Sequence, residues 1–329
     1  MSDSLTDANR IDANRTAFLR PSATACPDDF LALAGDCPRQ PLAFVRATGT
    51  AALQTARDAV AAGLATPLLV GEATQITADA AAIGWDLVGA EIIDADGEAG
   101  AIAAAIELVQ DGRAAGLVKG QLHTDVFMGG IVRRAAGIRT ERRLVHVFAM
   151  VPPAGGRPLL ISDAAVNIAP DTDTRTTAAL EMARLLRRMR VERPRIAVLS
   201  ATESELPAMP SSVEAAEIAA AARAVDKAAD FAGPLSLDLA ISPESAAIKQ
   251  ITGDSPSGLV AGHSDGLVVP DIVSGNVLFK SIVYFAGGLA AGVVLGGRVP
   301  IILTSRSDPP AARLASLVLA AIASQEVQV

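Results

Sequence analysis

Short apolar runs alternate with segments of helical periodicity along most of this sequence. The runs have the length of strands and are bounded by glycine or polar residues, whereas the segments between them carry apolar residues at helical spacing. This alternation is typical of α/β proteins, in which helices cover both faces of a doubly wound sheet. The predicted strands cover residues 42–47, 66–70, 91–94, 115–118, 144–151, 159–162, 195–200, 267–269, 290–295 and 299–303. The predicted helices cover residues 50–62, 73–83, 98–110, 125–136, 173–189, 211–225, 274–286 and the segment after 309.

The order of these elements also indicates how the chain is organised. Residues 1–38 are polar and are interpreted as a tail that includes one helix around residues 28–33. The strands at 144–151 and 159–162 lie on either side of a Pro/Gly-rich turn, which predicts a hairpin-like pair. An Arg-rich segment before this pair is interpreted as a crossing between two α/β units. The last predicted strand and helix can pack back against the first α/β unit.

The last predicted strand leads into a polar turn and then a helix. Residues 304–308 are polar, Asp308 is a predicted N-cap, and Pro309 suits the first helical position. Ligands collect outside the carboxyl ends of strands in open α/β sheets, and a helix N-terminus attracts anions. Arg306 adds a guanidinium that can hold a phosphate through two hydrogen bonds. The segment therefore predicts a binding site for a phosphate-bearing ligand. The alternative is an ordinary polar turn with a surface arginine.

A second polar loop, residues 119–124, also leads from a strand into a helix. It contains Lys119, His123 and Thr124, and its lysine is a further candidate for phosphate. Two such loops that face one cleft indicate a binding site more strongly than either does alone.

Five arginines also fall within eleven residues of this otherwise acidic chain. They are either a solvated helix end or a basic rim for a polyanion such as a coenzyme A nucleotide. The arginines are Arg133, Arg134, Arg139, Arg142 and Arg143.

Composition excludes several classes of protein. The net charge of −8 argues against a general nucleic-acid binder. Two cysteines are too few for a disulfide framework and fit a reducing cytoplasm. The first residues lack the apolar region of a secretory signal. The longest apolar stretch, 289–303, is broken by glycine, arginine and proline, so we expect two buried strands there and no membrane span.

Other motifs have plain structural interpretations. A formal GxSxG at 262–266 leads into a strand and has no downstream histidine, so we interpret it as a glycine-rich turn. The three histidines share no metal-ligand spacing, and no metal site is predicted. His146 lies in a strand pattern and is interpreted as a core or edge histidine with satisfied hydrogen bonds.

From about Ala43 onward the chain resembles the phosphate acetyltransferase and phosphate butyryltransferase family. It is most similar to the acyltransferase part of bifunctional enoyl-CoA hydratase/phosphate acetyltransferases. The N-terminal tail is too short to hold that hydratase domain. The matching stretches are GLATPLLVGE (63–72), LVKGQLHTD (117–125), GIRTERRLVHVFAM (137–150), SDAAVNIAPD (162–171), RIAVLSATE (195–203), GPLSLDLAIS (233–242), GLVVPDIVSGNVLFK (266–280) and VPIILTSRSD (299–308).

The resemblance implies a fold and a reaction. The fold is two doubly wound α/β domains of the isocitrate/isopropylmalate dehydrogenase type, with a cleft between them. We expect domain I at 39–145 and 297–329, and domain II inserted at 146–296. The reaction is acyl-CoA plus phosphate ⇌ acyl phosphate plus CoA, by direct thiolate attack and without a cofactor beyond the substrate coenzyme A. A cytoplasmic homodimer with no nucleic-acid or membrane partner is also implied.

The resemblance also assigns site residues. Ser305 and Arg306 match the serine–arginine pair of the family, where arginine holds phosphate and the serine region stabilises the oxyanion. Asp308 is the nearest carboxylate that can accept the thiol proton. Substrate binding is assigned to Lys119, His123, Thr124, Arg133, Asn276 and Lys280.

The chain departs from the family pattern at the proposed base. Acetyl-type members carry the catalytic aspartate further into the last helix, where this chain has Ala312, and a capping aspartate is a poor base. Near Gly130 they carry an arginine, which Arg133 or Lys119 is able to replace.

Two other functions are compatible with these departures. One is a non-catalytic homologue that binds acyl-CoA or acyl phosphate. The other is a metal-dependent dehydrogenase of related fold, with Asp238, Asp265 and Asp271 as ligands.

Overall fold

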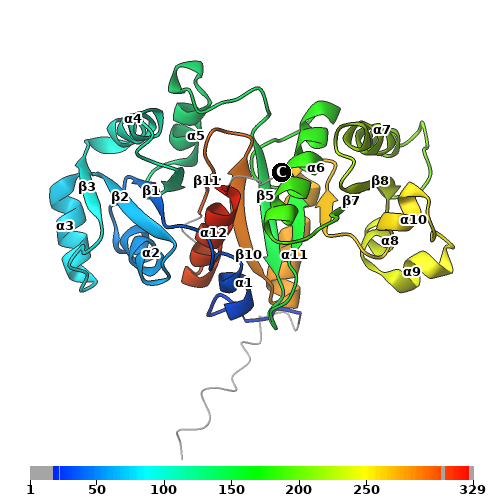
Figure 1. Cartoon of the computed structure of the whole chain (residues 1–329), viewed down its shortest axis with the longest axis horizontal. Helices are drawn as coiled ribbons and strands as arrows, with labels where there is room; N and C mark the ends of the chain where they lie inside the picture. Colours follow the sequence, from blue (N-terminus) through cyan, green and yellow to red (C-terminus); the bar gives the residue numbers. More distant parts are fainter. Residues whose placement is uncertain (1–17, 22, 305–307, 326–329) are drawn as a thin grey trace, which may run out of the picture.

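The protein is built around one long mixed sheet with helices on both faces (Figure 1). The computed structural model describes residues 18–21, 23–304 and 308–325 of the 329-residue chain. In this part, eleven strands form a sheet in the order β3-β2-β1-β4-β11-β10-β5-β6-β9-β7-β8. The predicted α/β class is confirmed.

The strands agree with the predicted apolar runs at most positions. The pairing of β5 with β6 is antiparallel, as predicted, and β11 returns to the first half of the sheet by pairing in parallel with β4. The strands are β1 (Gln40–Val45), β2 (Ala65–Gly71), β3 (Glu91–Asp94), β4 (Gly116–Lys119), β5 (Val145–Val151), β6 (Leu159–Ser162), β7 (Arg195–Leu199), β8 (Asp230–Leu235), β9 (Gly266–Val268), β10 (Leu289–Leu295) and β11 (Ile301–Ile302).

Most helices begin where the sequence places polar or small residues. Asp171 and Asp271 cap α6 and α11 by accepting hydrogen bonds from the backbone N–H groups of Thr174 and Ser274. The helices are α1 (Asp28–Ala32), α2 (Thr50–Ala61), α3 (Ala73–Ala82), α4 (Gly97–Gln110), α5 (Thr124–Val132), α6 (Thr172–Arg188), α7 (Pro210–Val225), α8 (Leu237–Ile241), α9 (Pro243–Ile248), α10 (Pro256–Val260), α11 (Ile272–Ala286), α12 (Pro310–Ala323) and the 3₁₀-helix η1 (Arg134–Ala136).

The sheet has two parallel halves that meet at a central antiparallel region. Strands β3, β2, β1, β4 and β11 are parallel to one another, as are β6, β9, β7 and β8. Between them, β10 is antiparallel to both β11 and β5, and pairs with β11 at Val294 and Ile301. The predicted boundary between 296 and 297 falls at this pairing. The division into two domains stays a prediction, because strands from both parts share one sheet.

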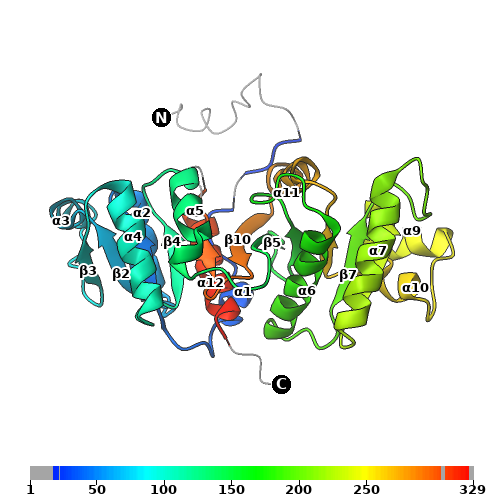
Figure 2. The same cartoon turned by 90° about the horizontal axis from the view of Figure 1, so that it is seen from above.

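Three apolar clusters show how the helices cover the sheet. One cluster joins α2, α12, α6 and α7 to one face along both halves. On the opposite face, α4 and α5 pack on the first half, and α8, α10 and α11 pack on the second. Consequently α5 and α11 stand on either side of the central strands β10 and β5 (Figure 2).

The region between 226 and 266 contains elements that the sequence pattern did not predict. Strand β8 contains Gly233 and Pro234, residues that are usual in turns and disfavoured in strands. It lies at the end of the sheet, where proline is tolerated. A Cβ at Gly233 would lie 2.7 Å from the carbonyl oxygen of Ala215, so glycine allows α7 to pack closely against β8. Short helices α8, α9 and α10 follow.

Two negative predictions can be compared directly with the structure. Residues 261–262 form a turn that leads to β9 at Gly266, which agrees with our rejection of the GxSxG motif as a nucleophile site. The apolar stretch 289–303 contains β10 and β11, as predicted. No helix among the described residues is long and apolar enough to span a membrane.

Candidate active site

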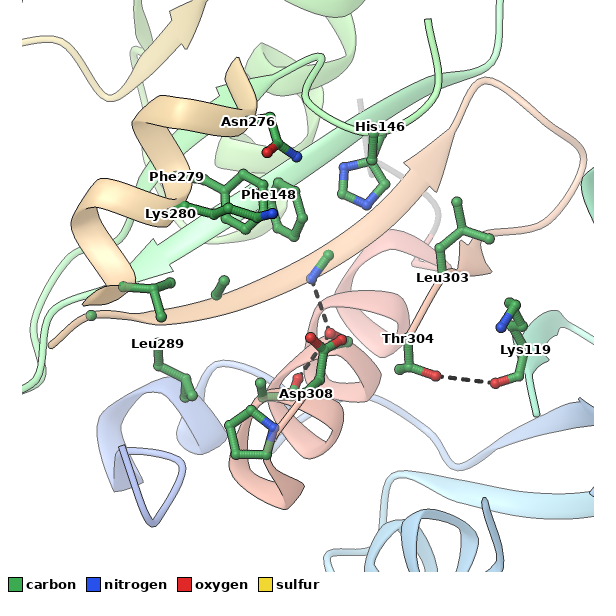
Figure 3. A pocket seen from close by; sticks show the side chains of 18 of the residues that line it. Lys119, His146, Phe148, Asn276, Phe279, Lys280, Leu289, Leu303, Thr304 and Asp308 are labelled. Carbon is green, nitrogen blue, oxygen red and sulfur yellow. Dashed lines mark hydrogen bonds between the residues drawn. The ribbon is translucent and has the colours of Figure 1, made fainter. Parts of the chain in front are cut away.

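A cavity of about 650 Å³ lies beside the central strands, between α5, α11 and the start of α12 (Figure 3). Its walls come from the ends of β4 and β11, the central strands β5 and β10, and the N-terminal parts of α5 and α12, with α11 on another side. Residues from both predicted polar loops line it. The predicted site residues found there are Lys119, His123, Thr124, Asn276, Lys280 and Asp308. Ser305 and Arg306 lie outside the described residues, so their placement stays a prediction.

Lys119 ends β4 at the cavity wall and is buried. Its carbonyl oxygen accepts a hydrogen bond from the Thr304 hydroxyl at 3.1 Å, which joins the segments after β4 and β11. At the next position, a Cβ on Gly120 would lie 2.4 Å from the carbonyl oxygen of Arg46. Glycine therefore lets the turn that follows Lys119 pack directly against the end of β1. The two predicted polar loops lie side by side, because β4 and β11 are parallel neighbours and each loop follows the carboxyl end of its strand.

A carboxylate holds His123 at the cavity. His123 is the N-cap residue of α5, and its Nδ1 lies 2.8 Å from Glu98 Oε1 on α4. The backbone N–H of His123 donates to Glu98 Oε2 at 3.2 Å, and Arg46 pairs with Glu98 at 3.3 Å. Partial burial raises the pKa of Glu98, but the hydrogen bonds and charge of His123 outweigh it and leave that pKa lowered. Glu98 therefore stays ionised and orients the imidazole.

The start of α12 differs by one residue from the prediction. Pro309 is the N-cap residue and Pro310 takes the first helical position, so the predicted N-cap at Asp308 is wrong. Proline is favoured at the first helical position, and the sequence alone does not show which of the consecutive residues Pro309 and Pro310 takes it. Asp308 lines the cavity, and its carbonyl oxygen accepts a hydrogen bond from Arg313 at 2.6 Å. Asp308 is therefore the residue before the N-cap of α12.

Helix α11 supplies both polar and aromatic groups. Asn276 Nδ2 lies 3.5 Å from the carbonyl oxygen of Ala164, at the limit of a hydrogen bond. The exposed Lys280 has its ammonium 5.9 Å from the centre of the Phe279 ring. Phe279 in turn stacks on Phe148 of β5, with 4.3 Å between ring centres. The cavity therefore has an aromatic surface beside its polar groups.

His146 on β5 borders the cavity, which its strand pattern did not reveal. It is 1% exposed, and its ring meets that of Phe148 edge-on with 4.3 Å between centres. Among the described residues, its Nδ1 has no hydrogen-bond partner, so the prediction of a satisfied core histidine is wrong in this respect. Burial lowers the pKa of His146 to about 4, and the negative charge of Asp163 opposes this shift in part. The imidazole is therefore neutral near pH 7.

The buried carboxylate of Asp163 shapes the adjoining wall. It accepts hydrogen bonds from the backbone N–H groups of His146, Ala165 and Val166, each at 2.9 Å. The Asn167 amide donates to it at 2.7 Å. Four donors satisfy this carboxylate, and they fix the loop that carries Ala165 into the cavity lining.

The basic segment at 133–143 stands apart from this cavity. Arg133 is exposed at the C-terminal end of α5, whereas the cavity borders the N-terminal end of that helix. Arg142 pairs with Glu181 of α6 at 2.8 Å. The assignment of Arg133 to substrate binding stays a prediction.

The aspartates of the dehydrogenase alternative serve separate structural purposes. Asp265 pairs with Arg157 at 3.0 Å, Asp271 caps α11, and Asp238 lies in the first turn of α8. In the part of the chain that the structure describes, no group of three or more His, Cys, Asp or Glu residues is arranged to hold a metal.

Comparison with known proteins identifies the family. The family model described as phosphate acetyl/butaryl transferase matches residues 98–321. The chain belongs to this family. As a phosphate acyltransferase it is similar to a phosphate acetyltransferase from Rhizobium meliloti, with 42% identity over 266 residues, which cover 80% of this chain and 83% of the relative.

Two further relatives of this phosphate acyltransferase are named for butyryl and branched-chain acyl groups. It is 32% identical to a phosphate butyryltransferase from Clostridium acetobutylicum over 271 residues, 82% of this chain and 88% of the relative. The crystal structure of a branched-chain phosphotransacylase from Enterococcus faecalis superposes with a TM-score of 0.74 and 29% identity, and covers 87% of this chain and 99% of that one. The family resemblance and the enzyme class inferred from the sequence are therefore confirmed.

Proposed function

We propose that this phosphate acyltransferase exchanges a short acyl group between coenzyme A and inorganic phosphate, in the reaction acyl-CoA plus phosphate ⇌ acyl phosphate plus CoA. The observation that carries the proposal is the convergence of two loops far apart in the sequence. Thr304 hydrogen-bonds the carbonyl of Lys119, and both residues line one cavity with His123, Thr124 and Asp308. The cavity therefore combines a cation, a carboxylate and a helix N-terminus with an apolar wall.

The phosphate is assigned to the end of β11 and the start of α12. The first backbone N–H groups of α12 and the positive end of its dipole favour an anion there. Lys119 adds a positive charge at the end of the neighbouring strand. By their match to the family, Arg306 holds the phosphate and Ser305 stabilises the oxyanion.

Asp308 is the proposed proton acceptor. In the direction of CoA attack, the thiol gives its proton to Asp308 and the sulfur attacks the acyl-phosphate carbonyl carbon. The carbon–oxygen bond to phosphate then breaks, and phosphate leaves with the electron pair. Both substrates are bound together, so no acyl-enzyme forms and no cofactor takes part. Asp308 lies at the cavity outside the capping position, which suits this role.

Asn276 and Lys280 are assigned to the coenzyme A side. They lie on α11, next to the aromatic surface and across from the phosphate end. Lys280 is exposed, as expected for a residue that meets a nucleotide phosphate at the cavity mouth. We expect a cytoplasmic homodimer that uses acyl-CoA, phosphate and acyl phosphate, with no nucleic-acid or membrane partner.

The test is thiol release from acetyl-, propionyl- and butyryl-CoA in the presence of phosphate. Replacement of Arg306 by alanine is expected to lower kcat/KM by about two to four orders of magnitude, the scale of one preorganised charge contact. Arg113→Ala is the matched control, because Arg113 pairs with Glu91 on the outer strand β3. Full activity of Arg306→Ala would discard that assignment. Tight acyl-CoA binding without turnover in the wild-type protein would favour a non-catalytic homologue.

A further inference from the structure

One buried polar side chain at the cavity has no part in the mechanism above. His146 is almost fully buried, yet its Nδ1 has no partner among the described residues. The carboxylate of Asp163 accepts a hydrogen bond from the backbone N–H of His146, and its other donors among the described residues come from the loop 165–167. Buried polar groups are rarely left without a partner, so this imidazole at the cavity wall has hydrogen-bonding capacity that the described residues do not use.

The adjacent strand leaves room for the imidazole. His146 and Phe148 lie opposite Val294 and Gly292 on β10. A Cβ at Gly292 would lie 2.9 Å from His146 Nε2 and 3.1 Å from Phe148 Cε1. Any larger residue at position 292 would therefore displace both rings. Glycine at position 292 of β10 therefore leaves the space that the His146 imidazole of β5 occupies in the cavity wall.

The surroundings of the ring indicate the kind of atom it binds. Phe148 packs against the imidazole edge and Phe279 stacks on Phe148, so an apolar surface adjoins the ring on one wall (Figure 3). Of the charged groups of the lining, Lys119 and Asp308 come from other elements, whereas Lys280 follows Phe279 on α11 with its ammonium 5.9 Å from the centre of that ring. A neutral imidazole has one N–H to donate and suits an uncharged oxygen that continues into an alkyl chain. A dianionic phosphate is expected to bind instead at the cationic side chains and the N-terminus of α12.

We propose that His146 donates a hydrogen bond to the carbonyl oxygen of the acyl group, and that Phe148 and Phe279 contact the acyl chain. The inference rests on the proposed function and adds a catalytic residue and an acyl subsite to it. When hydrogen phosphate attacks acyl-CoA, a bond forms between a phosphate oxygen and the carbonyl carbon, and the carbon–sulfur bond breaks. The sulfur leaves with the electron pair and receives the phosphate proton through Asp308. Negative charge develops on the carbonyl oxygen, and His146 stabilises it while keeping its own proton.

The experiment compares His146→Leu with His146→Gln, which retains an amide donor. His263→Leu is the matched control, because His263 is exposed in a turn outside the cavity lining. We expect His146→Leu to lower kcat by about 10²–10³, the effect of removing one oxyanion donor. The affinity for free CoA, which lacks the acyl carbonyl of the thioester, is expected to stay within about twofold of wild type. His146→Gln should recover part of kcat, because its amide can donate to the same oxygen.

A spectroscopic readout separates this proposal from the proposed function. Carbonyl-labelled [1-¹³C]acetyl-CoA, bound without phosphate, should show a downfield carbonyl shift in the wild-type protein that is lost in His146→Leu. A carbonyl resonance unchanged on binding, or wild-type kcat in His146→Leu, would overturn the role of His146. Absence of turnover in the wild-type protein would instead reject the proposed function, while the carbonyl shift would still decide whether the hydrogen bond exists.

Discussion

At the scale of single residues, the protonation of His146 has a consequence for stability. Its pKa is about 4 in the folded protein, against 6.5 for an exposed histidine, because burial disfavours the charged ring. Between these values the unfolded chain binds a proton that the folded protein does not bind. Stability from this group is therefore complete above pH 6.5 and is lost as the pH falls toward 4.

This linkage predicts a measurable difference between wild type and His146→Leu. From pH 6.5 to pH 4 the histidine accounts for a loss of about 3 kcal/mol in the free energy of unfolding, which the leucine variant lacks. Urea denaturation at several pH values gives both curves. If the free energy of unfolding changed with pH in the same way in both proteins, the predicted lowering of the pKa of His146 would be wrong.

His146 also shows where reasoning from residue patterns ends. An alternating strand pattern indicates which residues share a face of the sheet, but it does not reveal whether a helix covers that face. His146 lies on the face between α5 and α11, so its side chain meets a cavity. The position of residues 119, 123 and 124 at the cavity could be predicted, because a polar loop after a buried strand is typical of the end of an α/β sheet where ligands collect.

At the scale of elements, the turn from β4 to α5 depends on Gly120. A Cβ there would meet the backbone carbonyl oxygens of Arg46 at 2.4 Å and Val45 at 2.6 Å. Backbone atoms of an inner strand cannot move aside cheaply, so an alanine must push the turn outward and displace Lys119 from the Thr304 hydroxyl.

We therefore expect Gly120→Ala to lower stability by about 1–3 kcal/mol and to raise KM for phosphate. The matched control is Gly129→Ala within α5, where a Cβ would meet nothing within 4 Å. Alanine is the better helix former, so the control should be neutral or gain up to about 1 kcal/mol. Thermal unfolding and phosphate titrations measure both effects. Equal behaviour of the two variants would contradict the close packing of the turn.

The elements themselves were predictable wherever apolar runs were long and uninterrupted. Strands β1, β2, β5 and β10 consist mostly of apolar residues and lie near their predicted positions. The sequence did not reveal β8, because the glycine and proline it contains are signals of a turn. Nor did it reveal that the two parallel halves join into one sheet, since pairing across β10 depends on contacts distant in sequence.

At the scale of the whole molecule, helix α11 carries an unusual number of exposed apolar side chains. On this helix, Val273 is 67% exposed, Val277 60% and Tyr284 51%. Their spacing places them along one stripe of the helix, and Ile168 nearby is 77% exposed. Such a surface suits burial against a second copy of the chain, in agreement with the homodimer implied by the family resemblance.

If α11 forms the proposed dimer interface, the double variant Val273→Glu/Val277→Glu is expected to dissociate the dimer, because four carboxylates would face one another across a two-fold interface. Sedimentation velocity at micromolar concentration should give twice the 33.5 kDa chain mass for wild type and the single mass for the variant. Val225→Glu is the control, since Val225 is 65% exposed at the end of α7, which packs near the outermost strand β8, away from α11 (Figure 1). A monomeric wild-type protein, or a dimer that survives both glutamates, would remove α11 as the interface. Because Asn276 and Lys280 share this helix, loss of the dimer should also raise KM for CoA by loosening the wall that presents them.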